Sequence, residues 1–421
     1  MTPAVTSDDA RYALDLVRKI CDKVGPGLPG SPQERARAMI IKDELAGHLG
    51  ADKVVTEDFT VAPGSFLGWL PIGAVLILIA ALLNLSIGRL AWLPPGVSAS
   101  AAFFLALLTA LTGILQFVLY YEFVEPVFKK KTSVNVIGTL RKPGTTSVKR
   151  LLLLGGHHDS ALEMTWLRFL GYGYYVAVVT LFLGFFAMLI FSLIQLAGVV
   201  FNSPGAIRLG TLGGISLAYP VLPAVIFAAF FNRGGKGGGI VPGAADNLSA
   251  SALATAMCRF LVNNPACIPE ETEIRFVSFG SEEAGLRGSR RYVARHLEEL
   301  KALDARLLNF ETVAHPKITI LTSDVNNTVK NDPEMVKSVA AAAERAGVPH
   351  KVEPFPFGGG GTDTGSFSQA GLKAATLLPF KVPQQMVKFY HQKWDTPDNL
   401  TLEPFLNVLK LSLEWVRANG A

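Results

Sequence analysis

The chain contains little cysteine. Only three of its 421 residues are cysteines, Cys21, Cys258 and Cys267, and no two of them stand in a C-x-x-C spacing. Such a small and odd set argues against a disulfide framework and against a cysteine-based metal site. It fits buried free thiols and is compatible with a reducing compartment.

Charge is also scarce. Charged residues make up 17% of the sequence and hydrophobic residues 50%, whereas a soluble domain carries about 25% charged residues. The shortfall indicates membrane segments. The net charge of +5 and the pI near 9.0 do not indicate nucleic acid as a partner, because the cations are dispersed and no recognition motif is present.

Four stretches contain no Asp, Glu, Lys or Arg at all. They run over about residues 65–86, 101–121, 169–196 and 209–231. Each is long enough for a helix to cross a hydrocarbon core of about 30 Å. Buried helices of a soluble core would be the alternative, but runs of about 20 uncharged residues suit such helices poorly. We therefore predict four transmembrane helices and a lipid bilayer as a partner. No signal peptide is expected before them, because the first residues lead into an amphipathic helix.

The four predicted spans form two hairpins. Residues 64–121 make the first and residues 169–231 the second, and short linkers at 87–100 and 197–208 join their helices. All other residues then lie on one side of the membrane. We predict that they form one discontinuous soluble domain, made from residues 1–63, 122–168 and 232–421.

The side of the membrane follows from the distribution of cations. Each hairpin linker carries one cation, Arg89 or Arg208, whereas Lys129, Lys130 and Lys131 follow the second span on the other side. Positive charge near span ends is enriched in the cytoplasm. We therefore expect an integral multi-pass membrane protein whose large domain is cytoplasmic.

The soluble segments alternate between strand and helix patterns. Strands are expected at 54–61, 134–140, 150–154, 273–279 and 307–310, and helices at 32–49, 249–261, 288–296, 333–346 and 402–418. Alternation of this kind is typical of an α/β domain with helices on both faces of a parallel or mixed sheet. The stretch 150–154 is almost entirely apolar and should be a central strand.

Carboxylate and imidazole side chains gather where these strands end. The candidates are His157 with Asp159, Glu282 with Glu283, Glu311, Asp246 and His391. Active sites of open α/β sheets lie at the carboxyl ends of their strands. Imidazole with carboxylate is a ligand set that suits zinc. Five ligands exceed one tetrahedral ion but suit two ions that share a bridging carboxylate.

The adjacent acids Glu282 and Glu283 can have two different roles. One carboxylate can bind metal while the other stays free as a base. Asp159, two residues after His157, can orient that imidazole through its second ring nitrogen. Each motif alone is weak, since Glu-Glu is usually a solvated face and Asp246 could be a helix N-cap. The prediction depends on their order and context together.

This order of motifs resembles metallopeptidase family twenty-eight, which includes bacterial leucyl aminopeptidase and glutamate carboxypeptidase II. The G-S-P-Q-E-R-A-R-A-M-I-I segment, residues 30–41, resembles the entry helix of the family, and the G-T-D-T-G-S-F-S-Q-A-G-L segment, residues 361–372, its late Asp-containing loop. The resemblance implies an α/β/α zinc-exopeptidase domain into which the four membrane helices are inserted. It covers nearly all of the predicted soluble domain.

The resemblance also implies a role for each candidate residue. His157 and Glu311 would bind one zinc ion, Glu283 and His391 a second, with Asp246 bridging the two ions, Glu282 as the general base and Asp159 assisting His157. A cis peptide bond is expected between Asp246 and Asn247. The chain departs from the family at Glu311, where many members have Asp, and in the long insertion between His157 and Asp246.

Short tethers connect the predicted site to the membrane. Residues 160–168 link the first metal loop to the third span, and residues 232–245 link the fourth span to Asp246. At no more than about 3.6 Å per residue, the site must lie near the membrane surface. We therefore expect a peptide substrate that is found at or near the lipid.

The function expected from these features is an aminopeptidase, a metal-dependent hydrolase. A carboxypeptidase or dipeptidase on the same site is an alternative and would need a cation such as Lys381 or Lys388. A glutaminyl cyclase-like acyl transferase is another, against which His157 argues because it supplies the second metal site. A non-catalytic scaffold would be expected to lack ligands that are present here. A channel or transporter has little support, because the spans carry no ionisable residue.

Overall fold

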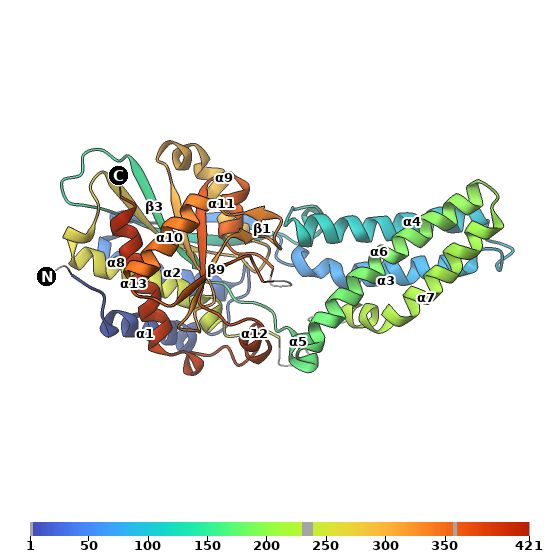
Figure 1. The fold of residues 1–421 in the computed structure, drawn as a ribbon, viewed down its shortest axis with the longest axis horizontal. Coiled ribbons are helices and arrows are strands. Elements are labelled where there is room, and N and C mark those ends of the chain that lie inside the picture. The colour runs from blue at the N-terminus through green and yellow to red at the C-terminus, as the bar shows by residue number, and fades with distance from the viewer. Residues whose placement is uncertain (1–2, 230–238, 357–359, 421) are drawn as a thin grey trace. The chain divides into compact units, whose positions relative to one another are not determined.

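The computed structural model describes residues 3–229, 239–356 and 360–420 (Figure 1). The chain forms two compact units. The sheet unit comprises Met1–Pro63, Lys129–Glu163 and Gly237–Ala421, and the helical unit comprises Gly64–Phe128 and Met164–Lys236. Each unit is described by itself.

The sheet unit is built on one mixed sheet in the order β1-β2-β4-β3-β5-β10-β6-β9. Its strands are β1 (Val54–Val61), β2 (Lys131–Arg141), β3 (Arg150–His157), β4 (Thr272–Phe279), β5 (Arg306–Phe310), β6 (Ile318–Leu321), β9 (His350–Glu353) and β10 (Lys373–Leu378). Strands β4, β3, β5 and β10 are parallel neighbours, whereas β1, β2 and β6 join antiparallel partners. A separate two-stranded ribbon contains β7 (Ser323–Asp324) and β8 (Val329–Lys330).

Strand β3 is central, as its apolar sequence predicts, but it is longer than expected. It continues through Gly155 and Gly156, so that His157 is its last residue and pairs with Phe279. The expected end at residue 154 was wrong because the two glycines allow the backbones to approach closely. A Cβ atom at Gly155 would lie 1.8 Å from the Val277 carbonyl oxygen.

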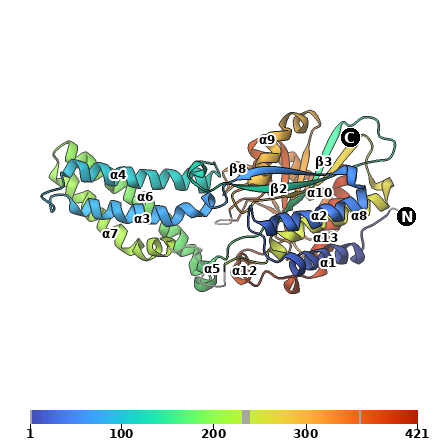
Figure 2. The same ribbon diagram turned by 180° about the vertical axis from the view of Figure 1, so that it is seen from behind.

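Helices cover both faces of the sheet. Helices α1 (Ser7–Val24), α2 (Pro32–Leu49), α8 (Ser249–Asn263), α10 (Pro333–Arg345) and α13 (Leu402–Ala418) pack on one face, and α9 (Arg287–Ala302) and α11 (Thr364–Gln369) pack together on the other. Figure 2 shows α1 and α2 on the same side as α8. Helix α2 begins where the sequence predicts, because the Ser31 side chain accepts a hydrogen bond from the Glu34 backbone N–H.

The core on the α9 side is aromatic. Phe279 at the end of β4 lies edge-on to Tyr292 of α9, and both rings contact Phe367 of α11 at centroid separations of 6.2 Å. Aromatic pairs in such geometries stabilise by about 1 kcal/mol beyond the area they bury. This packing anchors the end of β4, from which the next loop projects.

The helical unit contains α3 (Ser65–Ser86), α4 (Pro95–Thr112), α5 (Thr165–Leu170), α6 (Gly173–Val200) and α7 (Pro204–Ala229). Within the described residues, three helices are long and apolar enough to cross a membrane, namely Ser65–Ser86, Pro95–Val118 and Gly173–Val200. The first matches the predicted span end to end. Residues 209–229 of the fourth predicted span lie within α7, which begins five residues earlier than predicted, at Pro204. Residues 230 and 231 of that prediction lie outside the described residues.

The predicted bounds of the second and third spans were wrong at both ends. The second long apolar helix covers Pro95–Val118 rather than 101–121, and it begins early because proline is well suited to the first turn of a helix. The third covers Gly173–Val200 rather than 169–196, and it begins late because Gly171 adopts φ 52° and ends the short helix α5. A left-handed residue of this kind commonly terminates a helix.

Amide and hydroxyl groups connect the helices of this unit. The Asn84 side-chain amide of α3 donates to the Ser192 hydroxyl of α6 at 2.8 Å. The Gln195 side-chain amide of α6 donates to the backbone carbonyl oxygen of Asn84 at 3.0 Å and to the Thr211 hydroxyl of α7 at 2.7 Å. These four residues, which we call the amide network, join three helices of the bundle.

Candidate metal centre and active site

Three neighbouring parallel strands carry ligand groups at their carboxyl ends. His157 ends β3, Glu282 and Glu283 lie in the loop after β4, and Glu311 directly follows β5. Because β4, β3 and β5 are adjacent and parallel, their ends meet at one edge of the sheet. The topology therefore brings together acids and an imidazole that are far apart in the sequence.

Asp246 enters this cluster from the turn before α8. Its peptide bond to Asn247 is cis, as expected. The buried Asp395 carboxylate accepts hydrogen bonds from the backbone N–H groups of Ala245, at 2.7 Å, and Asp246, at 3.1 Å. Asp246 is not the N-cap of α8, whose cap position is Leu248, so its carboxylate is free to face the ligands.

Two groups of candidate ligand atoms share Asp246, and a third group joins His157 with Glu282 and Glu283. In one group, His391 Nε2 lies 3.0 Å from Asp246 Oδ2 and 2.9 Å from Glu283 Oε1. In the other, His157 Nε2 lies 3.4 Å from Asp246 Oδ1 and 3.8 Å from Glu311 Oε1. Within each group the candidate ligand atoms lie within 4.8 Å of one another. Asp246 thus presents one carboxylate oxygen to each of the two groups that share it.

These residues fit a divalent metal. Asp246 Oδ2 and His391 Nε2 are buried, yet neither makes a hydrogen bond of good geometry. Buried polar atoms that converge without such bonds are costly unless another group satisfies them. The donor set of imidazoles and carboxylates is the kind that binds zinc. Glu282 Oε2 lies 3.6 Å from His157 Nε2, beside the ligand groups.

The dense negative charge governs protonation in this cluster. Burial lowers the pKa of His157, but the carboxylates of Glu282, Asp159, Asp246 and Glu311 outweigh burial and hold this pKa well above its usual value. Burial raises the pKa of Glu282 well above the ordinary range, and neighbouring carboxylates add to this rise. A bound cation would supply positive charge to the same carboxylates.

Asp159 has a larger structural role than the sequence predicts. Its Oδ1 atom lies 3.3 Å from His157 Nδ1, the expected partner. The same carboxylate also accepts hydrogen bonds from the backbone N–H groups of Glu282 and Glu283, both at 3.0 Å. Asp159 therefore ties the loop after β3 to the loop after β4, in addition to orienting the imidazole.

Sequence reasoning missed three supporting residues. Asp395 holds the Asp246 turn, and the charged side chains of Glu34 and Arg37 on α2 are fully buried next to the ligand loops. Asp395 lies four residues after His391, and this proximity to a candidate ligand was the available signal. Glu34 and Arg37 stand in the recognised G-S-P-Q-E-R-A-R segment, where charge is ordinarily a solvated helix face.

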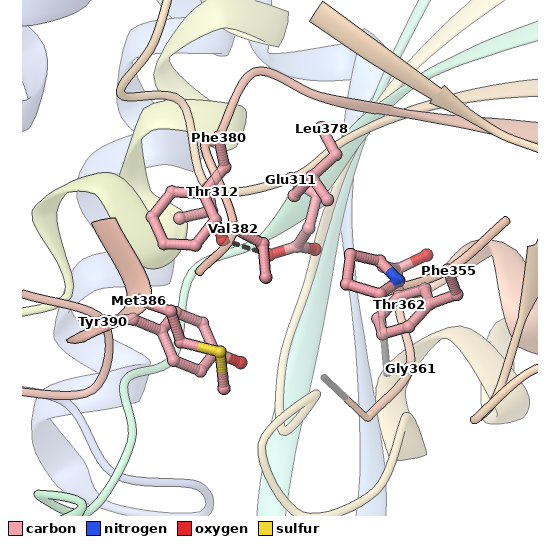
Figure 3. A pocket seen from close by; sticks show the side chains of 11 residues that line it. Glu311, Thr312, Phe355, Gly361, Thr362, Leu378, Phe380, Val382, Met386 and Tyr390 are labelled. Carbon is pink, nitrogen blue, oxygen red and sulfur yellow. Dashed lines mark hydrogen bonds between the residues drawn. The ribbon is translucent and has the colours of Figure 1, made fainter. Parts of the chain in front are cut away.

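An apolar pocket opens beside Glu311 (Figure 3). Its empty volume, including the part open to solvent, is about 400 Å³. The lining consists of Glu311, Thr312, Phe355, Pro356, Gly361, Thr362, Leu378, Phe380, Val382, Met386 and Tyr390. Tyr390 and Met386 lie on one side of Glu311, and Phe355 and Thr362 on the other. The Tyr390 ring also stacks on the candidate ligand His391 at a centroid separation of 4.0 Å.

The sequence and the fold have counterparts among known proteins. Residues 225–416 match the profile described as Peptidase family M28. Aminopeptidase YwaD of Bacillus subtilis (strain 168) is 30% identical over 177 residues, which are 42% of this chain and 34% of that protein. The alignment thus spans about a third of the length of that relative.

Solved structures share the fold at low sequence identity. A glutaminyl cyclase from Fimbriiglobus ruber has a TM-score of 0.55 and 14% identity, over 99% of this chain and 96% of that chain. BSAP, a zinc aminopeptidase from Bacillus subtilis, has a TM-score of 0.53 and 16% identity, over 97% and 94% of the two chains. At these identities the likeness concerns the fold alone.

The mixed sheet with imidazole and carboxylate groups clustered at its central strand ends is an arrangement that suits a metal ion. Residues 225–416, a little under half of the chain, carry the match to peptidase family M28.

Proposed function

We propose that the protein is a membrane-anchored di-zinc aminopeptidase that removes N-terminal residues from peptides near the membrane surface. The observation that best supports this function is the pair of candidate ligand groups that share Asp246, with Glu282 next to them. His157 and Glu311 would hold one ion, and Glu283 and His391 the other. When bound, zinc supplies Lewis-acid polarisation of the scissile carbonyl and lowers the pKa of water.

Glu282 is the proposed general base. Its carboxylate lies 3.6 Å from His157, and Asp159 fixes its backbone. A carboxylate with a raised pKa is suited to take a proton from the attacking water and give it to the leaving amine near neutral pH. Glu283, held by the same Asp159 carboxylate, would remain a ligand. The shared clamp would keep these two adjacent acids in separate roles.

The pocket beside Glu311 supports a preference for an apolar residue at the cleaved position. Phe355, Leu378, Phe380, Val382 and Met386 supply its apolar lining. Burial of a leucine- or phenylalanine-sized side chain there contributes about 1.5–3 kcal/mol. A small or charged side chain would gain less, so we expect cleavage after apolar N-terminal residues.

A carboxypeptidase on the same site is the second candidate. Lys381 and Lys388 are exposed and flank Val382 and Met386 of the pocket lining. Either cation could pair with the terminal carboxylate of a substrate. Because a glutaminyl cyclase shares the fold, acyl transfer is a third candidate activity. The reaction products distinguish an aminopeptidase, a carboxypeptidase and an acyl transferase.

We propose four membrane helices as the anchor, with α7 added to the three long apolar helices described above. Residues 158–172 connect the end of β3 to the third proposed span, and this length limits the reach of the site from the bilayer. The cations at positions 129–131 support a cytoplasmic catalytic domain. Replacing both hairpins by short loops should reduce the cleavage of membrane-associated peptides more than that of soluble ones.

The decisive experiment is mass spectrometry of a mixed peptide library treated with the detergent-purified protein and with Glu282→Gln. We expect loss of single N-terminal residues by the wild type, and at least a 100-fold lower rate for the variant with its metal retained. Loss from the C-terminus would identify a carboxypeptidase, and cyclised N-terminal glutamine a cyclase. An equal rate in the variant would remove Glu282 from the mechanism.

A further inference from the structure

Two charged side chains on α2 are buried completely in the sheet unit. Glu34 and Arg37 are both 0% exposed, whereas Arg35 on the same helix is exposed and pairs with Asp58 at 2.9 Å. A buried charge is costly unless its atoms are satisfied by hydrogen bonds. The partners of these two side chains therefore indicate what their burial achieves.

The Glu34 carboxylate accepts four hydrogen bonds. Its Oε1 atom accepts from the Ser281 backbone N–H at 2.7 Å, and from the Ser281 and Ser133 hydroxyls at 2.9 Å each. Its Oε2 atom accepts from the Gly30 backbone N–H at 2.7 Å. All four partners act as donors, which favours a carboxylate oxygen at each position.

Ser281 directly precedes the two acids of the active-site loop. It adopts φ 54°, a left-handed conformation that is uncommon for a residue with a side chain. The next two backbone N–H groups, of Glu282 and Glu283, donate to Asp159. Three consecutive N–H groups are thus bound by two buried carboxylates, and Glu34 holds the residue that begins the turn.

Arg37 contacts two further ligand-bearing segments. Its Nη1 atom donates to the His158 carbonyl oxygen at 3.1 Å, and its Nη2 atom donates to the Pro242 carbonyl oxygen at 2.6 Å. His158 follows the ligand His157, and Pro242 begins the segment that leads to Asp246. Nε and Nη2 also donate to the Gly25 carbonyl oxygen. The rigid guanidinium therefore ties both segments to the loop before α2.

We propose that Glu34 and Arg37 are positioning residues of the metal site, through which α2 fixes the backbone of three ligand-bearing loops. Glu34 sets the turn that presents Glu282 and Glu283, and Arg37 sets the segments that present His157 and Asp246. The inference rests on the proposed metal-dependent function. Helix α2 lies outside residues 225–416, the part that matches the family profile.

The test is zinc affinity, measured with zinc alone against a competing chelator on the full-length protein in detergent. In the variant Glu34→Gln, the side-chain amide N–H would face the N–H and O–H groups that now donate to Glu34. The variant Arg37→Lys keeps the charge, but an ammonium group cannot bind the His158 and Pro242 carbonyl oxygens as a guanidinium fork does. Their matched controls on α2 are Glu44→Gln and Arg35→Lys, whose side chains are 21% and 48% exposed. Loss of partners that orient metal ligands weakens affinity by about 10- to 100-fold, which we expect for the two test variants only.

Thermal unfolding of the metal-free proteins separates positioning from general stability. A purely structural role would lower the metal-free Tm in Glu34→Gln and Arg37→Lys while zinc affinity stayed at the wild-type value, and that result would overturn the inference. If these variants do not fold, Ser281→Ala removes one contact to Glu34 and should weaken zinc binding by a smaller factor; unchanged affinity there also overturns it. Absence of zinc binding by the wild type would instead reject the proposed function, and the inference with it.

Discussion

The two units of the molecule place polar and apolar groups in opposite ways. The sheet unit buries carboxylates, imidazoles and a guanidinium, including Asp159, Asp246 and Arg37. The helical unit exposes large aliphatic side chains, with Leu82 68%, Val176 69% and Leu183 63% exposed. Inside α3, α4 and α6, the buried polar side chains are hydroxyls and amides.

This contrast follows from the surroundings that each unit requires. Large exposed apolar areas are unfavourable in water and mark surfaces that contact lipid or another protein. A buried charge is tolerable only where hydrogen bonds or a metal satisfy it. The low charge of the whole sequence is therefore a property of the helical unit, whereas the sheet unit concentrates charge at one functional edge.

A charge introduced on the exposed apolar face of the helical unit is expected to have the largest effect of the substitutions that test this contrast between the units. We expect Leu183→Lys to reduce membrane integration, because a lysine near the centre of a span costs about 2.5–3.5 kcal/mol. Val55→Lys, at an exposed position of β1, should change little. The measurement is the membrane-integrated fraction of each variant. Equal integration of the two variants would contradict a lipid-facing surface at Leu183.

Removal of a buried acid tests the polar interior of the sheet unit. Asp159→Asn should lower zinc affinity or turnover by about 10- to 100-fold. The amide can accept from only one of the two N–H groups that now donate to Asp159, and it no longer pairs with the His157 imidazole. Metal titration and kcat measurements check this, with Asp58→Asn, an exposed surface acid, as the control. Wild-type zinc affinity and turnover in Asp159→Asn would show that the hydrogen bonds from Glu282 and Glu283 to Asp159 do not support the site.

The amide network tests the interior of the helical unit, where a smaller effect is expected. Asn84→Leu should lower stability by about 0.6–1.7 kcal/mol, the range measured for hydrogen bonds between membrane helices. The loss is modest because the replacement leucine packs well among apolar neighbours. Thermal unfolding in detergent measures it, with Leu82→Ile on the outer face as the control. A stabilised variant would show that the network serves something other than stability.

The smallest expected effect concerns a pH-dependent pair on the sheet unit. His296 Nε2 lies 2.7 Å from Glu57 Oε1, and this hydrogen bond raises the pKa of His296 above its ordinary value of 6.5. Glu299 and Arg295 also face this pair. The stabilisation is present in full below about pH 6.5 and is lost as pH rises through the raised pKa.

His296→Gln removes this proton-linked stabilisation. Because the pair is partly exposed, we expect a difference of about 0.5 kcal/mol from the wild type near pH 6. The difference should vanish near pH 9. Unfolding curves at the two pH values measure it, and a difference that does not depend on pH would contradict the assignment.

Long periodic elements were predictable from the sequence. Strand β1 and helices α3 and α13 have the predicted bounds, because their apolar residues repeat with a clear period or form a long uncharged run. Strands β6 and β9 were missed. Each has four residues, and β9 at the sheet edge is mostly exposed and polar, so that neither offers enough of a repeat to detect.

Most of the candidate ligands were predictable because their carboxylate and imidazole side chains stand at or just after the ends of recognisable strands. Their supports were not, as Glu34 and Ser281 illustrate, since they lie 247 positions apart in the chain. A buried charge on a helix has the same sequence pattern as a solvated one until the fold brings its partners to it. Single-sequence periodicity contains no information about such distant contacts.

The placement of the two hairpins within the chain sets an order of assembly during synthesis. Val61 of β1 pairs with Lys131 of β2, so this ladder can close only after the first hairpin has been made. His157 precedes the second hairpin, whereas Asp246, Glu283, Glu311 and His391 follow it. A growing chain therefore contains both hairpins before it contains a second candidate ligand, and the candidate site is complete only once His391 has left the ribosome.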